Sequence, residues 1–217
     1  MDKRKNYYLT IDPETAGGLD APLVYDLGGC IHDKKGNVYE TFSFVISDIF
    51  MNQALMETAY YYDKGPAYWQ DIAKGTRKVI TLKGARYKIR RICKKYGVKA
   101  IIAHNAYFDY KALRNTMEAV TDEKYFLPYG IEVWDTLKMA RDTIGKQKTY
   151  KRFCNDNGYL TRYNKPRMTA EILYKYISGD NDFIENHTGL EDVLIEKEIF
   201  AKCVAQHKPM TKKLWKD

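Results

Sequence analysis

The sequence predicts an α/β fold in which helices flank a mixed five-stranded sheet. Three segments rich in aromatic and β-branched residues, at 7–11, 23–32 and 38–46, have the composition of strands and follow one another without a helical pattern between them. Two further apolar segments, at 98–103 and 131–134, are separated by a helical pattern. Consecutive strands favour antiparallel pairing and a strand–helix–strand unit favours parallel pairing, so the sheet is expected to contain both.

The first half of the chain holds the antiparallel part. Residues 33–37, Asp-Lys-Lys-Gly-Asn, are predicted to form a hairpin turn, because Gly36 and Asn37 can take positive φ. The next segment, 47–78, contains the breaker Gly65-Pro66 and is expected to form short helices and loops. Its aromatic residues are expected either to stack unpaired bases or, for at least three of them, to pack this segment onto the core: Tyr60, Tyr61, Tyr62, Tyr68 and Trp69.

The second half of the chain is expected to alternate between helices and strands. Apolar residues recur at spacings near three and four from Ile80 to Tyr96, which predicts a helix that ends at Gly97. After the buried strand at 98–103, further helices are expected at 108–120, after Asp135-Thr136, at 169–177 and at 189–206.

Length and composition favour one domain. With 217 residues, 45% of them apolar, the chain can bury one substantial core, and no Pro-, Gly- or Ser-rich linker divides it. We therefore expect a single domain over 1–217, with an aromatic and basic insert at about 47–78. The four cysteines lack the spacing of a zinc site or a disulfide framework, so reduced thiols are expected at Cys30, Cys93, Cys154 and Cys203.

No apolar segment is long enough for a signal sequence or a membrane span. The sequence therefore predicts a cytoplasmic protein with no membrane partner, and it contains no indication of oligomeric state.

Positive charge is concentrated in one part of the chain. The formal net charge is +8, yet residues 72–108 contain eleven basic residues and no acid, so the rest of the chain is net negative. The basic side chains of such a segment can bind the phosphates of a nucleic acid. The alternative is the solvated face of a helix, which is the more frequent explanation for an isolated basic helix.

Two carboxylates follow the first strand segment. Asp12 and Glu14 are two residues apart, so along a strand they project from the same face. They repel each other unless a cation lies between them, and hard oxygen ligands favour Mg²⁺ or Mn²⁺ over zinc. This pair alone is a weak signal, because Asp-x-Glu occurs in many unrelated proteins.

A second acidic site is predicted at the start of the last helix. Thr188 and Glu191 fit a capping box, which makes Thr188 the N-cap, His187 the preceding residue and Asp192 the fourth helical residue. These last two positions usually carry apolar side chains that contact each other. Here an imidazole and a carboxylate replace them, which indicates a chemical role; the alternative is a surface ion pair.

Together the motifs resemble those of the DnaQ-like (DEDDh) 3′-to-5′ exonucleases of the ribonuclease H-like superfamily. Asp12-x-Glu14-Thr15 is similar to their first motif, His104-Asn105-Ala-x-Phe108-Asp109 to their second, and His187-x₄-Asp192 to their third. The resemblance extends from residue 7 to about residue 200. The tyrosine branch of these enzymes has Tyr four residues before the last Asp, where this chain has Thr188, so the histidine branch is the better match.

This resemblance implies a ribonuclease H-like fold and a two-metal hydrolysis of phosphodiester bonds. Asp12, Glu14, Asp109 and Asp192 would bind two divalent ions, Mg²⁺ or Mn²⁺, and His187 would be the general base. For Asp135, which matches a polar residue often seen after the last strand of such proteins, we expect a helix-cap role. The resemblance also implies that four residues bind the terminal nucleotide: Thr15, His104, Asn105 and Phe108.

The expected partner is a nucleic acid with a free 3′ end, with single-stranded DNA preferred and nucleoside 5′-monophosphates as products. An exoribonuclease, an enzyme that degrades short oligonucleotides, a non-catalytic nucleic-acid-binding module and an endonuclease of the ribonuclease H type remain alternatives. A proofreading role would need a separate polymerase, and we expect a bacterial or phage origin. Pro13 departs from the pattern, because proline cannot donate a sheet hydrogen bond; we expect it to be tolerated where the first strand ends.

Overall fold

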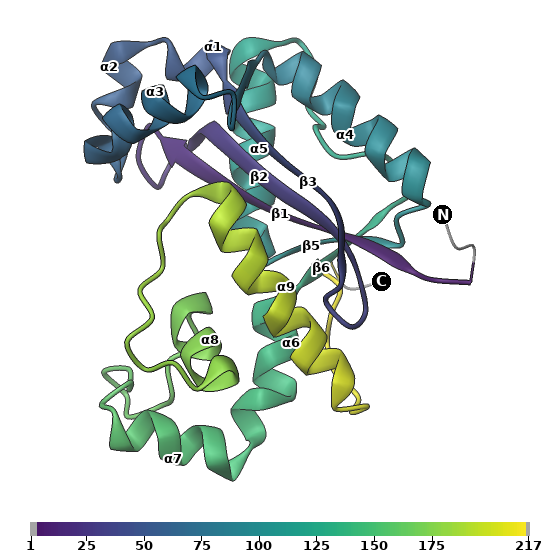
Figure 1. The fold of residues 1–217 in the computed structure, drawn as a ribbon, viewed down its shortest axis with the longest axis vertical. Helices are drawn as coiled ribbons and strands as arrows, with labels where there is room; N and C mark the ends of the chain where they lie inside the picture. Colours follow the sequence, from purple (N-terminus) through teal and green to yellow (C-terminus); the bar gives the residue numbers. More distant parts are fainter. Residues whose placement is uncertain (1–3, 216–217) are drawn as a thin grey trace.

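The computed structural model describes residues 4–215. Six strands form one mixed sheet in the order β4-β3-β2-β1-β5-β6, with helices on both faces (Figure 1). Strands β1, β2 and β3 pair antiparallel, β5 and β6 continue the sheet parallel to β1, and β4 pairs parallel to β3. The strands are β1 (Tyr7–Ala16), β2 (Leu23–Asp33), β3 (Val38–Ile46), β4 (Lys78–Ile80), β5 (Ala100–Ala103) and β6 (Glu132–Asp135).

The mixed α/β sheet was predicted, but the prediction of five strands was wrong by one. The additional strand is β4, which pairs with the last three residues of β3. Ile80 belongs to this strand and not to the following helix, which begins only at Leu82. Three residues are too few to display a period, and Ile80 also fits the helical spacing of the residues after it. Pairing with a distant strand therefore decides its conformation.

The first strand runs farther than predicted and passes through Pro13. Pro13 pairs with Leu27 of β2, and the register shifts only after Glu14. Strand β5 pairs with β1 only as far as Thr10, so the proline lies where β1 has one neighbouring strand. Where a strand has only one neighbour, the backbone N–H donor that proline lacks can be missing without breaking a hydrogen bond of the sheet. The expectation that the strand ends at Pro13 was therefore wrong, although the proline does lie beyond the three-stranded part of the sheet.

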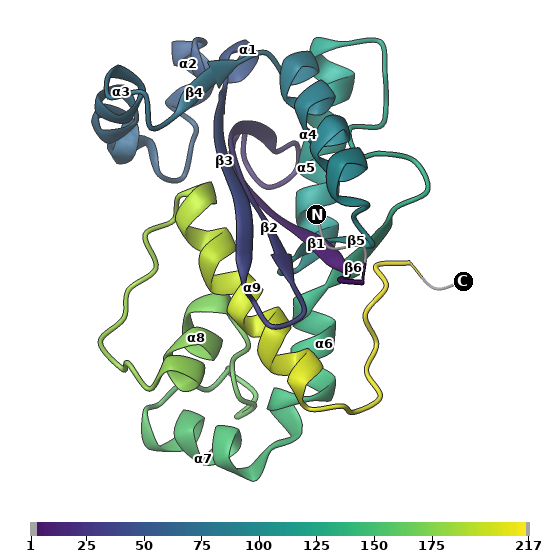
Figure 2. The same cartoon turned by 45° about the vertical axis from the view of Figure 1, so that its right-hand side comes forward.

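Two helical layers cover the sheet (Figure 2). Leu9 and Ile11 of β1 pack against α4 (Leu82–Tyr96) and α5 (Ala106–Val120). Tyr8, on the opposite face, packs against Phe200, and its ring centroid lies 4.7 Å from that of Phe200. This second layer consists of α6 (Thr136–Asp142), α7 (Lys148–Asp156), α8 (Ala170–Ser178) and α9 (Gly189–Ala205), with the short η2 (Ile144–Lys146).

The segment after β3 forms short helices and loops, as predicted. Tyr68 is buried against Tyr25, whereas Tyr60, Tyr62 and Trp69 are about half exposed or more. The aromatic residues of this segment therefore differ in role, and only some of them pack it onto the core. Its helices are α1 (Ser47–Phe50), α2 (Gln53–Met56), η1 (Tyr62–Lys64) and α3 (Gly65–Ala73).

A buried carboxylate on β2 ties this segment to the sheet. Asp26 is fully buried and accepts hydrogen bonds from the Tyr68 hydroxyl at 2.8 Å and from Arg77 Nη1 at 2.9 Å. It also accepts from the backbone N–H of Gly189 at 3.1 Å, in the first turn of α9. One side chain thus links β2, α3 and the start of α9.

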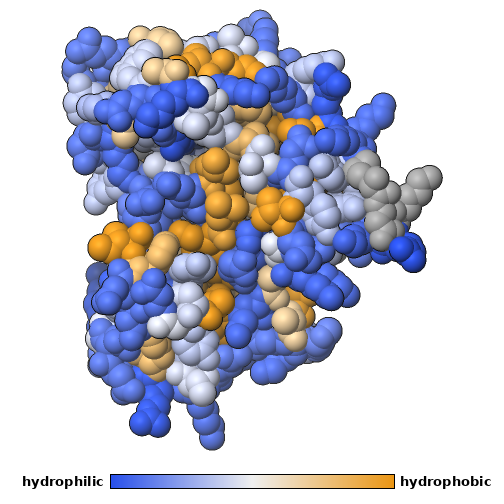
Figure 3. Space-filling view, in the orientation of Figure 1, coloured by the Kyte–Doolittle hydropathy of each residue, from blue (hydrophilic) through white to orange (hydrophobic). Residues whose placement is uncertain are grey.

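All four cysteines are free, and each is buried. In the part of the chain that the structure describes, no helix has both the length and the apolar character that a membrane span requires. Figure 3 shows a mainly hydrophilic face, with hydrophobic side chains gathered between the half that carries α3 and the half that carries α8.

Candidate active site

Two glycines let the start of α9 lie directly on the sheet. A Cβ added to Gly28 of β2 would be 1.9 Å from the carbonyl carbon of Gly189, and a Cβ added to Gly189 would be 2.5 Å from the carbonyl oxygen of Asp12. Only residues without a side chain permit this contact between backbones. As a consequence Asp192, one turn into α9, is held beside Asp12 on β1.

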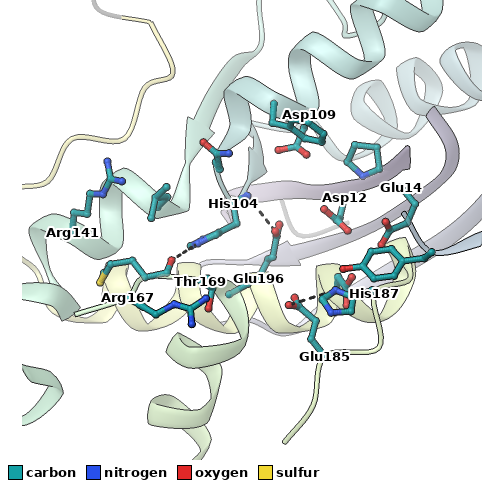
Figure 4. Close-up of a pocket in the computed structure, with 18 of the residues that line it drawn as sticks. Asp12, Glu14, His104, Asp109, Arg141, Arg167, Thr169, Glu185, His187 and Glu196 are labelled. Carbon is teal, nitrogen blue, oxygen red and sulfur yellow. Dashed lines mark hydrogen bonds and ion pairs between the residues drawn. The ribbon is translucent and has the colours of Figure 1, made fainter. Parts of the chain in front are cut away.

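The three sequence motifs meet at one cavity of about 580 Å³. Asp12 and Glu14 project from β1 into this cavity, and Asp109 lies in the first turn of α5 (Figure 4). Asp192 lies in the first turn of α9 and lines the same cavity. His187 lies in the loop before α9 and faces the same cavity. The structure therefore brings together all five residues that the sequence assigned to catalysis.

The carboxylates form a site that can hold a divalent cation. Asp12, Glu14 and Asp192 each place one oxygen within 4.8 Å of the other two. Asp109 lies on the same cavity and is only 5% exposed. One oxygen of Asp109 and one of Asp192 are buried without a hydrogen-bond partner. Buried carboxylate oxygens normally have partners, so these unpartnered atoms fit ligands of a hard cation.

Burial and mutual repulsion raise the pKa values of these groups. The pKa of Glu14 is raised to about 9, first by burial and then by the charges of Asp192 and Asp26. Burial, followed by repulsion from Glu185, raises the pKa of Asp192 to about 8. The pKa values of Asp12 and Asp109 are also raised well above the usual range, with burial as the largest cause. Without a cation, burial and mutual repulsion therefore favour the protonated form of these carboxylates.

We predict that the stability of the metal-free protein falls as pH rises. Glu14 and Asp192 titrate near pH 4 in the unfolded chain but near 9 and 8 when folded, so folding is coupled to proton uptake between these values. Their stabilising contribution is complete below about pH 4 and is lost as pH rises through 8 to 9. Thermal unfolding in EDTA from pH 5 to 9 would measure this decline. Saturating Mn²⁺ should flatten the profile, and a flat profile in EDTA would contradict the prediction.

His187 is positioned by the segment that follows β3. Its ring stacks on Tyr61, with centroids 4.5 Å apart and an interplanar angle of 12°. Lys64 donates a hydrogen bond to the carbonyl oxygen of Asn186 and another, at 3.3 Å, to that of His187. Partial burial, together with the charge of Lys64, lowers the pKa of the imidazole below its usual value. At neutral pH the ring is therefore unprotonated and can accept a proton.

The capping box at the start of α9 is formed only in part. Thr188 is the N-cap, as predicted. Its hydroxyl, however, donates to the Glu191 carboxylate at 2.6 Å and does not accept from the helix backbone. The Asp192 carboxylate accepts a hydrogen bond from the backbone of His187, which has a positive φ of 50°. The two side chains also approach each other as expected, since a ring nitrogen of His187 and an oxygen of Asp192 lie within 4.8 Å.

The second motif forms another wall of the cavity. His104, Asn105 and Phe108 all line it, whereas Thr15 is not among the lining residues. Both ring nitrogens of His104 have partners, Thr136 Oγ1 at 2.9 Å and the Met168 carbonyl oxygen at 2.7 Å. A carbonyl oxygen only accepts, so Nε2 carries the proton and His104 contributes its shape, not a free nitrogen, to the cavity.

Asp135 acts as a helix cap, as expected. Its carboxylate accepts from the backbone N–H of Leu137 at 2.9 Å, at the start of α6. It also accepts from the backbone N–H of Asn105 at 3.1 Å. Asp135 therefore fixes both the start of α6 and the loop that carries the second motif.

Sequence reasoning missed several residues of this cavity. Glu185 and Glu196 add two carboxylates, and Arg141 and Arg167 lie toward the end of the cavity opposite Glu14 (Figure 4). The spacing of Glu196, four residues after Asp192 on one helix face, was a usable signal. The others come from loops and from α6, whose approach to the site cannot be read from local patterns.

The eleven basic residues between 72 and 108 do not line this cavity. Most of them lie on α4, which packs on the opposite face of the sheet from α9 (Figure 2). On that side of the molecule Lys95 pairs with Glu40, and Arg86 pairs with Glu123. These basic residues are close to the second motif in the sequence, but in the structure their positive charge does not lie next to the carboxylates.

Comparison of the sequence with protein-family models and with curated proteins finds no match. Solved structures of exonuclease I, however, are similar to this chain. The E. coli protein in complex with a 5cy-dT13 oligonucleotide is 18% identical, with a TM-score of 0.54 over 94% of this chain and 41% of that chain. Exonuclease I from Methylocaldum szegediense is 14% identical, with a TM-score of 0.53 over 94% and 41%.

An apo structure of exonuclease I is 19% identical, with a TM-score of 0.56 over 93% of this chain and 42% of that chain. The chain thus spans about two-fifths of the length of these proteins. Similarity at this level of identity establishes a shared fold. The ribonuclease H-like fold predicted from the three motifs is therefore confirmed.

Proposed function

We propose that this protein is a metal-dependent 3′-to-5′ exonuclease that hydrolyses the terminal phosphodiester bond of a nucleic acid. The observation that carries the proposal is that β1, α5, α9 and the loop before α9 bring five residues to one cavity: Asp12, Glu14, Asp109, Asp192 and His187. A fold shared with exonuclease I supports the same reaction.

The proposed cofactors are two divalent ions, Mg²⁺ or Mn²⁺, held by Asp12, Glu14, Asp109 and Asp192. Ions at this site would polarise the scissile phosphate and activate a water molecule. His187 accepts the proton of that water, for which its lowered pKa keeps the ring neutral. Tyr61 stacks on the ring and Lys64 holds the backbone on either side of residue 187, so the base is oriented before substrate arrives.

The terminal nucleotide is proposed to occupy the cavity between the carboxylates and the second motif. Asn105 and Phe108 would contact the sugar and base of this nucleotide, and His104 also lines the cavity. Thr15 does not line the cavity, so its proposed role would require the nucleotide to extend beyond the cavity wall. Arg141 and Arg167, toward the far end of the cavity, are exposed and form no ion pair with another residue among 4–215. They are suited to a second phosphate of the substrate.

An end-labelled oligonucleotide tests the direction of the reaction. With Mg²⁺ present, a 5′-labelled strand should shorten stepwise, and a 3′-labelled strand should release its label at once as a nucleoside 5′-monophosphate. Internal fragments as first products would indicate an endonuclease. Binding without any hydrolysis would indicate a non-catalytic nucleic-acid-binding module. Either of these results would contradict the proposal.

Single-stranded DNA is the proposed substrate. Support comes from exonuclease I, whose solved structures include complexes with a 5cy-dT13 and a dA16 oligonucleotide. An exoribonuclease or an enzyme specific for short oligonucleotides would use the same site. Digestion of single-stranded DNA, duplex DNA, RNA and dinucleotides side by side would separate them, and RNA cleaved faster than DNA would overturn the choice of substrate.

We further propose that residues 1–217 act as one exonuclease domain, with the segment at about 47–78 as an insert that serves the site. The contacts of Tyr61 and Lys64 with the loop around His187 support this role. In a cell, proofreading by this domain would require a polymerase as a separate partner.

A further inference from the structure

Glu196 is a buried carboxylate that the proposed site does not use. It lies on α9, one turn after Asp192, and is 4% exposed. One of its oxygens accepts from the backbone N–H of His104 at 3.2 Å. The other, Oε2, is buried and has no hydrogen-bond partner. Leaving a buried carboxylate oxygen unpaired costs free energy, so this atom requires an explanation.

The unpartnered oxygen belongs to the same cavity as the other carboxylates. Glu196 lines that cavity, and Figure 4 shows its carboxylate facing the space between Asp12 and Asp109. Its charge is the largest electrostatic influence on Asp12, and Asp109 is the largest such influence on Glu196. The largest electrostatic influences on Glu196 all come from other acids, Asp109, Asp192 and Glu185.

The cavity thus has two acidic halves that share Asp12. In one half, Asp12, Glu14 and Asp192 already approach within 4.8 Å of one another. In the other half, toward His104, lie Asp109 and Glu196, each with one unpartnered oxygen. In the absence of Glu196, Asp12 and Asp109 alone would supply protein oxygens to this second half.

We propose that Glu196 is a fifth carboxylate ligand, which binds a divalent cation together with Asp12 and Asp109. This inference rests on the proposed function, because it assigns a further ligand to the same metal site. Four carboxylates balance the charge of two divalent ions, so a fifth makes the site more negative than its ions require. We expect tight cation binding in the half of the site that contains Asp109.

Glu196→Gln distinguishes a ligand from a structural residue. The amide oxygen of Gln can still accept from the His104 N–H, so a purely structural role survives the substitution. Replacing Oε2 by an NH₂ group removes the anionic oxygen that would bind the cation. The matched control is Glu198→Gln on the same helix, where the native side chain is 39% exposed and pairs with Lys197.

Calorimetric titration of the full chain with Mn²⁺ alone is the test. We expect Glu196→Gln to weaken the binding of one ion by at least about tenfold and Glu198→Gln to leave the isotherm unchanged. In EDTA, Glu196→Gln should unfold at the same temperature as the wild type or higher, because the neutral amide keeps the acceptor for the His104 N–H and cannot acquire a buried charge.

Each other outcome has a defined meaning. An unchanged Mn²⁺ isotherm for Glu196→Gln, with or without a loss of stability in EDTA, would overturn the role as a ligand and leave the proposed function intact. Weakened Mn²⁺ binding in a protein that hydrolyses no oligonucleotide would support the ligand and overturn the function. No Mn²⁺ uptake by the wild type would overturn both.

Discussion

Replacing His187 with alanine is expected to lower kcat by about two to four orders of magnitude, while Mn²⁺ binding changes little. The imidazole lies beside the carboxylates, stacked on Tyr61, and its pKa is lowered by burial and by Lys64. It is therefore a neutral base at pH 7, and no other histidine among residues 4–215 lines the cavity with a free ring nitrogen.

Single-turnover hydrolysis of a labelled oligonucleotide across pH measures this effect. In the wild type the rate should rise with pH and reach a plateau, with a midpoint below the usual imidazole value of about 6.5. In His187→Ala that rise should disappear, and added imidazole should restore part of the activity. His207→Ala, in an exposed histidine beyond the end of α9, is the matched control and should retain full activity.

A loss of Mn²⁺ binding in His187→Ala would change the assignment. Glu185, His187 and Asp192 also lie close enough to hold a cation, with one ligand atom each within 4.8 Å of the others. In that arrangement His187 would be a metal ligand and could not accept a proton from water. Equal losses of metal binding and of activity would therefore contradict its role as the general base.

Replacing Arg77 with methionine is expected to destabilise the protein by about 3–5 kcal/mol. Arg77 is 8% exposed, and its Nη1 lies 2.9 Å from the fully buried Asp26 carboxylate. Removing the guanidinium leaves that carboxylate buried without a cation, and burial already raises its pKa. Asp26 also holds the Gly189 N–H, so the start of α9 should loosen and activity should fall together with stability.

Denaturant unfolding in EDTA measures this effect. Arg114→Met is the matched control, because Arg114 and its partner Glu118 are 46% and 40% exposed; it should cost less than about 1 kcal/mol. Adding Asp26→Asn to Arg77→Met should restore part of the lost stability, since the uncompensated charge is removed. Equal costs for the two arginine substitutions would show that the buried pair contributes no more than a surface pair.

The parts of the fold that were predictable are those with strong local patterns. Strands β1, β2 and β3 are runs of mostly buried residues rich in aromatic and β-branched side chains, and helices α4 and α9 each bury several apolar residues along one side. The elements that were missed bury few residues. In α7 only Tyr150 and Cys154 are buried, and β4 has three residues and no buried one.

The candidate site was predictable because its residues lie at the ends and starts of regular elements. Asp12, Asp109 and Asp192 occupy a strand or the first turn of a helix, and the topology of the sheet brings these positions together. The contact of Tyr61 with His187 was not predictable, because the two residues are far apart in the chain and meet through loop geometry. The same holds for the link between Asp26 and Gly189.

Anomalous diffraction from crystals soaked in Mn²⁺ would test the central claim most directly, because it locates the cations themselves. We predict two manganese peaks in the cavity, one among Asp12, Glu14 and Asp192 and one between Asp12 and Asp109, with His187 unliganded. No peak in the cavity, or a single peak bound by Glu185, His187 and Asp192, would contradict a two-metal nuclease with histidine as its base.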